Sequence, residues 1–100
     1  MSLPLKTAIY RVTQEAMNNI AKHSQAGSVL LSLRKKGNTI ELTIKDNGMG
    51  FDLKEILSPE SSKRGLGLNS MRERTELLGG TFEIESTKGR GTVIRALWPL

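Results

Sequence analysis

The chain contains no cysteine, so disulfides and thiolate metal sites are excluded. Aromatic residues make up only 4% of the sequence, too few for the stacking platform that single-stranded nucleic acid requires. A membrane-spanning helix needs about 20 consecutive apolar residues, and the sequence contains no apolar run of that length. The sequence also does not begin with the pattern of a secretory leader, in which charged residues precede an apolar stretch. We therefore expect no direct nucleic-acid partner and no membrane contact for this segment.

The length and the charge bound the remaining possibilities. One hundred residues suffice for one domain with a single two-layer core. Fifteen Lys and Arg against ten Asp and Glu give a net charge of +5, and such a basic surface could favour nucleic acid, an anionic membrane or a phosphate-bearing ligand. Residues 1–3 look like a start sequence or an added remnant, and residues 4–100 are interpreted as the domain.

Hydrophobic periodicity predicts a helix, two strands, a long loop, a second helix and two more strands. Pro4 suits a first helical turn, and Gly37-Asn38 is a favoured two-residue hairpin turn. This order predicts an α/β (α+β) two-layer sandwich with the helices on one face of an open sheet, and it excludes a doubly wound parallel sheet. The predicted ranges are helix 5–23, strands 29–37 and 39–47, a lid at 47–64, helix 66–78, and strands 81–86 and 92–98.

Two polar residues one helical turn apart form the first candidate site. Glu15 and Asn19 lie at the shoulder of the apolar stripe of the first helix. Because Mg²⁺ takes one or two protein oxygens together with substrate phosphates, Asn19 is a candidate ligand, and Glu15 could orient or deprotonate a water. Lys22 could meet a phosphate, whereas His23 is interpreted as a packing or capping residue and not as a phosphoacceptor. An ordinary polar helix shoulder is the alternative.

The second candidate is Asp46-Asn47-Gly48-Met49-Gly50, directly after a predicted strand. Asp46 can accept a hydrogen bond from an exocyclic amine such as that of adenine, while Gly48 and Gly50 let the backbone approach a flat base. The alternative is a plain hairpin turn, for which Asn-Gly is a favoured pair. The lack of alternation in the residues that follow argues against that alternative.

The third candidate is a glycine turn at the start of the second helix, where free N–H groups favour phosphate oxygens. It lacks the ending of a P-loop and does not follow a strand as a dinucleotide fingerprint would. A simple loop-to-helix hinge is the alternative. Thr92, near the end of the chain, either lies under a bound base or is an ordinary strand residue. The residues of the predicted phosphate turn are Lys63, Arg64, Gly65, Leu66, Gly67 and Leu68.

In this order, QEAMNNIAKHSQA, DNGMGF and GLGLNSMRERTELLGG resemble the N, G1 and G2 boxes of the histidine-kinase catalytic and ATP-binding domain. The resemblance covers nearly the whole chain. Within that family, the motifs most specifically resemble a subfamily of sensor kinases whose response regulators carry a helix-turn-helix output domain. It implies a Bergerat-type ATP-binding fold with a mixed, mostly antiparallel sheet, and ATP and Mg²⁺ as ligands.

Carried over by position, the resemblance makes Asn19 the Mg²⁺ ligand, Asp46 the adenine-binding acid and Thr92 the threonine near the adenine. Glu15 occupies a position where this subfamily has a glutamate. The remaining matches are Lys22 and His23 at the end of the N box, Gly48 and Gly50 in G1, and Gly65 and Gly67 in G2.

The resemblance implies an enzyme domain that transfers the γ-phosphate of ATP to a histidine on a separate dimerisation domain. That domain is expected N-terminal to residue 4, so the isolated chain would lack its own phosphoacceptor. ATP or ADP, the dimerisation domain and a response regulator are the implied partners of a cytoplasmic domain whose parent could be membrane-anchored. An anti-sigma-factor serine kinase and a non-catalytic nucleotide sensor remain as alternatives, although intact Glu15, Asn19 and Asp46 argue against the sensor.

Overall fold

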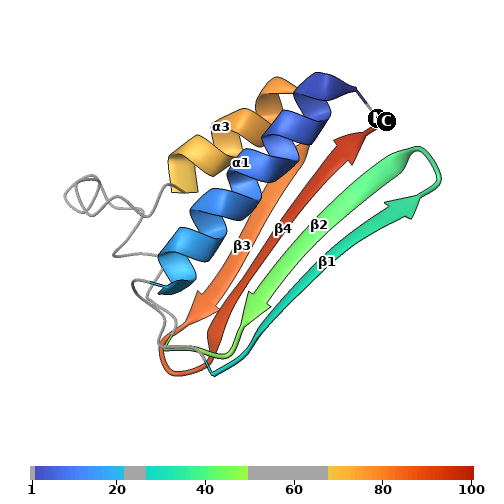
Figure 1. Cartoon of the computed structure of the whole chain (residues 1–100). Helices are drawn as coiled ribbons and strands as arrows, with labels where there is room; N and C mark the ends of the chain where they lie inside the picture. The colour runs from blue at the N-terminus through green and yellow to red at the C-terminus, as the bar shows by residue number, and fades with distance from the viewer. Residues whose placement is uncertain (1, 22–26, 50–67) are drawn as a thin grey trace.

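The structure is a computed structural model that describes residues 2–21, 27–49 and 68–100. These ranges contain two helices and four strands (Figure 1). None of the described helices is long and apolar enough to cross a membrane. The elements are α1 (Leu3–Asn19), β1 (Val29–Lys36), β2 (Thr39–Asp46), α3 (Leu68–Leu77), β3 (Thr81–Thr87) and β4 (Gly91–Pro99).

Helix α1 begins earlier than its periodicity predicts. The Ser2 hydroxyl accepts a hydrogen bond from the Leu5 N–H at 3.2 Å and caps the helix, and Pro4 lies in the first turn. Residues 2 and 3 therefore take part in the described fold, while their assignment to a start remnant stays a prediction. One face of α1 is buried through Leu5, Ala8, Val12 and Ala16.

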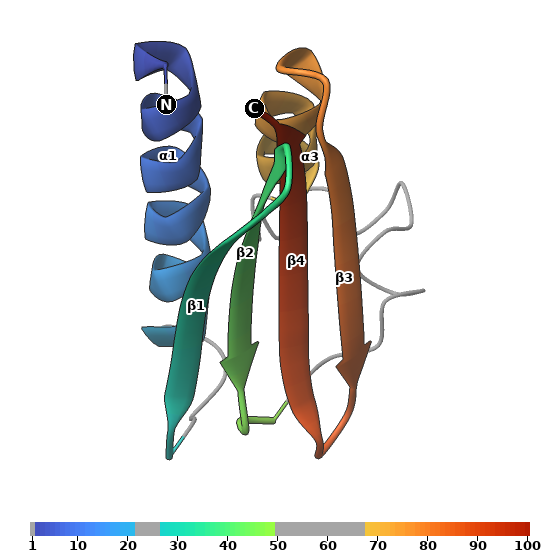
Figure 2. The same cartoon turned by 90° about the vertical axis from the view of Figure 1, so that its right-hand side faces the viewer.

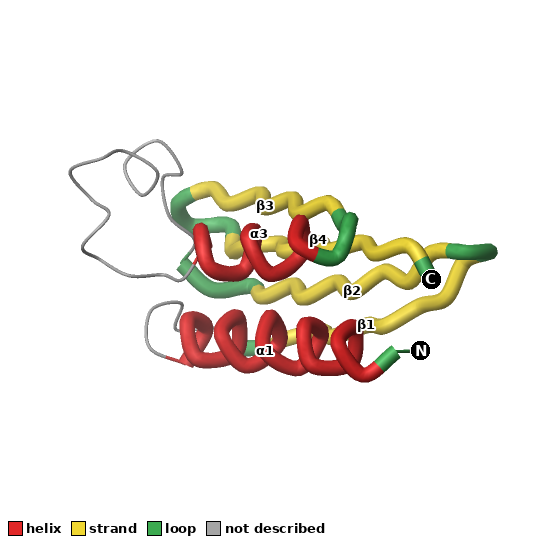
Figure 3. The backbone as a smooth tube through the Cα atoms, turned by 90° about the horizontal axis from the view of Figure 1, so that it is seen from above, coloured by secondary structure: helices red, strands yellow, loops and turns green. Residues whose placement is uncertain are grey.

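The four strands form one sheet in the order β1-β2-β4-β3, and each neighbouring pair is antiparallel. Gly37 and Asn38 form the predicted two-residue turn between β1 and β2, with Gly37 at φ 57°. Figures 2 and 3 show both helices on the same side of the sheet. The predicted two-layer α/β fold with helices on one face is confirmed.

Residues that pair across the sheet form transverse rows, and successive rows on one face are two residues apart along each strand. On the helix side the inner rows are apolar and make up most of the core. We call the row of Ile44, Ile94 and Ile84 the isoleucine row. The next rows are Leu42 with Ala96 and Phe82, and then Ile40 with Trp98.

The elements meet at two opposite ends of the molecule. The last turn of α1, the start of α3 and the end of β2 lie together at one end, which we call the Asp46 end (Figure 1). The start of α1, the end of α3 and the end of β4 lie at the other, which we call the Trp98 end. A hollow at the Trp98 end is lined by Ser2, Leu5, Leu78, Pro99 and Leu100.

Candidate functional site

The last turns of α1 carry Glu15 and Asn19 at the Asp46 end. Both side chains are half-buried, neither solvated nor in the core. At about 100° per residue, side chains four positions apart lie roughly 40° apart around the helix axis. The carboxylate of Glu15 and the amide of Asn19 are therefore neighbours on the helix surface beside the buried Ala16. This is the helix-shoulder position that the sequence predicted.

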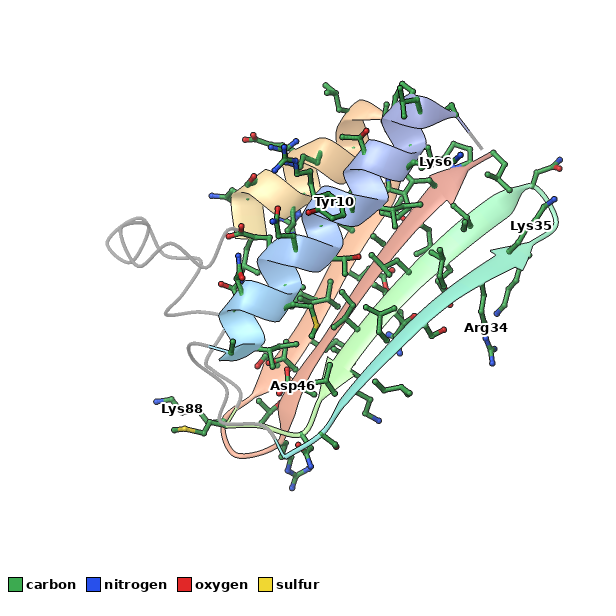
Figure 4. The ribbon with its side chains drawn as sticks, in the orientation of Figure 1. Lys6, Tyr10, Arg34, Lys35, Asp46 and Lys88 are labelled. Carbon is green, nitrogen blue, oxygen red and sulfur yellow. The ribbon has the colours of Figure 1, made fainter. Side chains whose placement is uncertain are left out.

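A polar row crosses the helix side of the sheet at the same end. Asp46 is the last residue of β2 and pairs with Thr92 on β4, which pairs with Ser86 on β3. Asp46 is 5% exposed and Thr92 is 8% exposed, whereas Ser86 is half-buried. Figure 4 shows Asp46 at the end of β2, at the end of the molecule where α1 finishes. We call Asp46, Thr92 and Ser86 the polar row; it lies directly beyond the isoleucine row.

The Asp46 carboxylate is oriented by its own turn. Its Oδ1 accepts a hydrogen bond from the Gly48 N–H at 2.8 Å, which forms an Asx turn directly after β2. Within residues 2–21, 27–49 and 68–100, no group donates to Oδ2. Because the carboxylate is nearly inaccessible to bulk water, an N–H group that reaches Oδ2 would make a strong hydrogen bond.

Gly91 allows the two central strands to come together at this end. Its φ is 91°, in the left-handed region that favours glycine. A Cβ at this position would overlap the carbonyl oxygen of Asp46. Only glycine therefore lets β4 begin directly against the end of β2 and set Thr92 beside Asp46. None of the three predicted motifs includes Gly91, although the sequence shows a pair of glycines, Gly89 and Gly91, just before Thr92.

Asn47 ties the Asp46 turn to the chain that leads into β1. Its Oδ1 accepts hydrogen bonds from the N–H groups of Gly27 and Ser28, both at 2.9 Å, and its own N–H donates to the Ser28 carbonyl at 3.3 Å. On the other side of the turn, the Met49 carbonyl accepts from the Gly89 N–H. The segment after Asp46 is therefore held from two directions. The sequence predicts Asn47 only as part of a possible hairpin turn, and its contacts with Gly27 and Ser28 are seen only in the structure.

Several predicted residues lie outside the described residues. Leu68 is described as the first residue of α3 and belongs to the core, with 7% exposure. The structure thus brings Asp46, Gly48 and Thr92 together and puts α1 with Asn19 at the same end. The predicted residues outside the described ranges are Lys22, His23, Gly50, Lys63, Arg64, Gly65, Leu66 and Gly67, together with most of the predicted lid.

The oxygen donors near the end of α1 suit a hard cation such as Mg²⁺. In the described part of the chain, no group of three or more His, Cys, Asp or Glu side chains could hold an ion by themselves. Mg²⁺ does not require such a cage, because it retains waters and takes one or two protein oxygens with substrate phosphates. The amide oxygen of Asn19, with the Glu15 carboxylate one turn away, suits that chemistry.

Comparison with known proteins decides the family. The profile of the "Histidine kinase-, DNA gyrase B-, and HSP90-like ATPase" family matches residues 5–100, nearly the full length. The chain belongs to this ATPase family. The resemblance inferred from the three motifs is therefore confirmed, and nucleotide binding follows from the family.

Relatives within the family are sensor kinases. The chain is 41% identical over 95 residues to the signal transduction histidine-protein kinase/phosphatase DegS of Bacillus subtilis strain 168, covering 95% of this chain and 24% of DegS. It is 40% identical over 96 residues to the oxygen sensor histidine kinase NreB of Staphylococcus carnosus strain TM300, covering 96% of this chain and 26% of NreB. The chain thus spans about a quarter of the length of these relatives.

A solved structure supports the same ATPase fold. The ATP-binding domain of PrrB from Mycobacterium tuberculosis superposes with a TM-score of 0.72 at 28% sequence identity. The superposition covers 93% of this chain and 67% of that domain. The described helices and strands of this chain are therefore those of a histidine-kinase ATP-binding domain.

Proposed function

We propose that this chain is the ATP-binding catalytic domain of a two-component sensor histidine kinase. It would transfer the γ-phosphate of ATP to a histidine on a separate dimerisation domain. The observation that carries the proposal is the buried Asp46 carboxylate, held by Gly48 at one oxygen, at the same end of the molecule as Asn19, the last residue of α1 (Figure 1). The sensor-kinase names of the relatives support the same activity.

Asp46 would recognise the adenine ring. The 6-amino group of adenine donates hydrogen, which is what the Oδ2 atom of a carboxylate accepts. Guanine has a carbonyl at that position, so two acceptors would face each other inside a site with little water. Selectivity for adenine over guanine would therefore rest on Asp46.

Asn19 and Glu15 would act on the phosphates. The Asn19 amide oxygen would ligate Mg²⁺, and the bound ion would neutralise part of the negative charge of the phosphates. Glu15 would orient or deprotonate the attacking group, because its carboxylate lies one helical turn from the ligand. Lys22 and the glycine turn at Gly65 to Gly67 are proposed to bind the phosphates as well. Rate enhancement in phosphoryl transfer comes mainly from such positioning and charge stabilisation.

The proposed partners belong to a longer protein. The phosphoacceptor histidine would lie on a helical dimerisation domain of the parent kinase, and the phosphoryl group would pass on to a response regulator with a helix-turn-helix output domain. His23 would remain a structural residue of the N box. The domain would work in the cytoplasm.

Asparagine substitutions on α1 test the proposal. Asn19→Ala should abolish phosphoryl transfer to an added histidine-bearing helical domain and remove the Mg²⁺ dependence of ATP binding, measured by calorimetry. Asn18→Ala is the matched control, because Asn18 is the exposed neighbour on the same turn and points about 100° away. Its activity should match that of the unmodified chain. Undiminished transfer by Asn19→Ala, or a chain that does not bind ATP, would contradict the proposal.

A further inference from the structure

Ser86 belongs to none of the three sequence motifs, yet it completes the polar row. It lies on β3 beside Thr92, and its Oγ is 2.8 Å from the Thr92 Oγ1. The Ser86 hydroxyl also donates to the Gly91 carbonyl oxygen at 3.2 Å. Ser86 therefore contacts both Gly91, which lets β4 begin close to β2, and Thr92, the next residue.

Either hydroxyl could donate in the Ser86–Thr92 contact, and one arrangement of the hydrogens satisfies both contacts of Ser86 at once. A hydroxyl has one hydrogen to donate, whereas a carbonyl oxygen can only accept. With the Ser86 hydrogen directed at Gly91, the Ser86 Oγ presents a lone pair to Thr92. Thr92 then donates its own hydrogen to Ser86, and the Thr92 Oγ1 keeps lone pairs for another donor.

We propose that Ser86 is a positioning residue that holds the Thr92 hydroxyl as a hydrogen-bond acceptor toward the bound purine. The inference rests on the proposed function, because it assumes that a purine binds beside Asp46. Cross-strand partners have Cβ atoms about 5 Å apart, so the Asp46 carboxylate and the Thr92 hydroxyl form two neighbouring acceptors. A 6-amino group carries two hydrogens and suits such a pair, directly or through one water.

The polar row would thereby give a stronger preference for purines with a 6-amino group than Asp46 alone would give. Without Ser86, the Thr92 hydroxyl can rotate and donate as easily as accept. The site would then tolerate a purine that offers no N–H at this position. Ser86 would in this way set selectivity without touching the nucleotide.

The test compares ATP with purine riboside triphosphate, which lacks the 6-amino group, in calorimetric titrations of the whole chain. The unmodified chain should prefer ATP. In Ser86→Ala the ratio of ATP affinity to purine riboside triphosphate affinity should fall by about threefold to tenfold, which corresponds to the usual net value of one neutral hydrogen bond. Ser86→Thr keeps a hydroxyl and should retain the preference.

Ser32→Ala is the matched control. Ser32 is also a half-buried serine of this sheet, but it pairs with Thr43 and lies on the face away from the helices. The control should bind both ligands as the unmodified chain does. If Ser86→Ala does not fold, Ser86→Cys replaces it, because a thiol has nearly the same shape and is a weak donor and acceptor.

A double-mutant cycle separates positioning from a structural role. Thr92→Val should lose the preference that depends on Ser86, and adding Ser86→Ala to it should cause no further loss. Additive losses, equal weakening of both ligands by Ser86→Ala, or an unchanged preference would each overturn the inference. A chain that binds neither ligand would overturn the proposed function and the inference together. A chain that prefers ATP, with Ser86→Ala preferring it equally, would overturn the inference alone.

Discussion

The two ends of the sheet are built from opposite kinds of residue. At the Trp98 end the outermost helix-side row pairs Ile40 with Trp98, which is fully buried, and the start of α1 and the end of α3 lie at the same end (Figure 1). At the Asp46 end the outermost row consists of Asp46, Thr92 and Ser86. The same face of the same strands therefore changes from close apolar packing to oriented polar groups within a few rows.

Gly80 packs closely against the last strand at the Trp98 end. A Cβ at Gly80 would overlap the Leu97 carbonyl oxygen and lie 2.8 Å from the Trp98 ring. The indole N–H of Trp98 is buried, and no acceptor among the described residues reaches it. Burying an unpaired donor costs about 1 to 3 kcal/mol, so Trp98 contributes stability through the packing of its ring and not through its N–H. The Trp98 end supplies stability, and the Asp46 end carries the polar groups that we propose bind the nucleotide.

The largest expected effect is on the Trp98 end. Trp98→Ala should lower the free energy of unfolding by about 3 to 5 kcal/mol, because it removes a fully buried ring from a closely packed region. Urea unfolding measures this loss. ATP affinity of the fraction that remains folded should be unchanged. A several-fold loss of affinity in that fraction would show that the two ends are not independent.

Gly91→Ala should destabilise the Asp46 end because it distorts the backbone where β4 begins beside β2. Positive φ costs an alanine about 1 to 2 kcal/mol, and overlap with the Asp46 carbonyl should raise the total to roughly 2 to 4 kcal/mol. ATP affinity should fall as well, because β4 can no longer begin beside β2. Gly89→Ala is the matched control, since Gly89 has φ 82° and open space around it. Equal losses of stability in the two variants would contradict this account.

Asp46→Ala should affect ligand binding more than folding. It removes the proposed acceptor for the 6-amino group and should cost roughly 1.5 to 3 kcal/mol of ATP binding, the value of a charged hydrogen bond. The preference for ATP over GTP should disappear in calorimetric titrations. Asp46→Asn refines the test, because an amide oxygen can still accept from Gly48 while the NH₂ group faces the adenine amine. Unchanged ATP affinity in both variants would refute the adenine assignment.

The smallest expected effect comes from Asn47→Ala. It removes the acceptor for the Gly27 and Ser28 N–H groups, but Asn47 is exposed and water can replace it. The free energy of unfolding should fall by about 0.5 to 1.5 kcal/mol. Hydrogen exchange at the Gly27 and Ser28 amides should accelerate, while exchange within β4 should not. Unchanged exchange at both amides would show that Asn47 does not hold this segment.

Local signals were sufficient for most of the element order. Alternation in Ile40, Leu42 and Ile44 predicted which face of β2 is buried, and Gly37-Asn38 predicted the turn. The start of α1 was placed too late because the capping hydroxyl of Ser2 lies outside the apolar pattern. Such short-range features are encoded by neighbouring residues and can be read without the fold.

The class of chemistry could be predicted from local patterns, because Asn19 lies on an amphipathic helix and Asp46 comes directly before a glycine turn. The neighbours of Asp46 could not be predicted in this way. Thr92, Ser86 and the close approach of Gly91 depend on the register between β2, β4 and β3. That register is set by backbone pairing and by burial of one face between strands far apart along the chain, and a shift by one residue would turn the polar row to the opposite face.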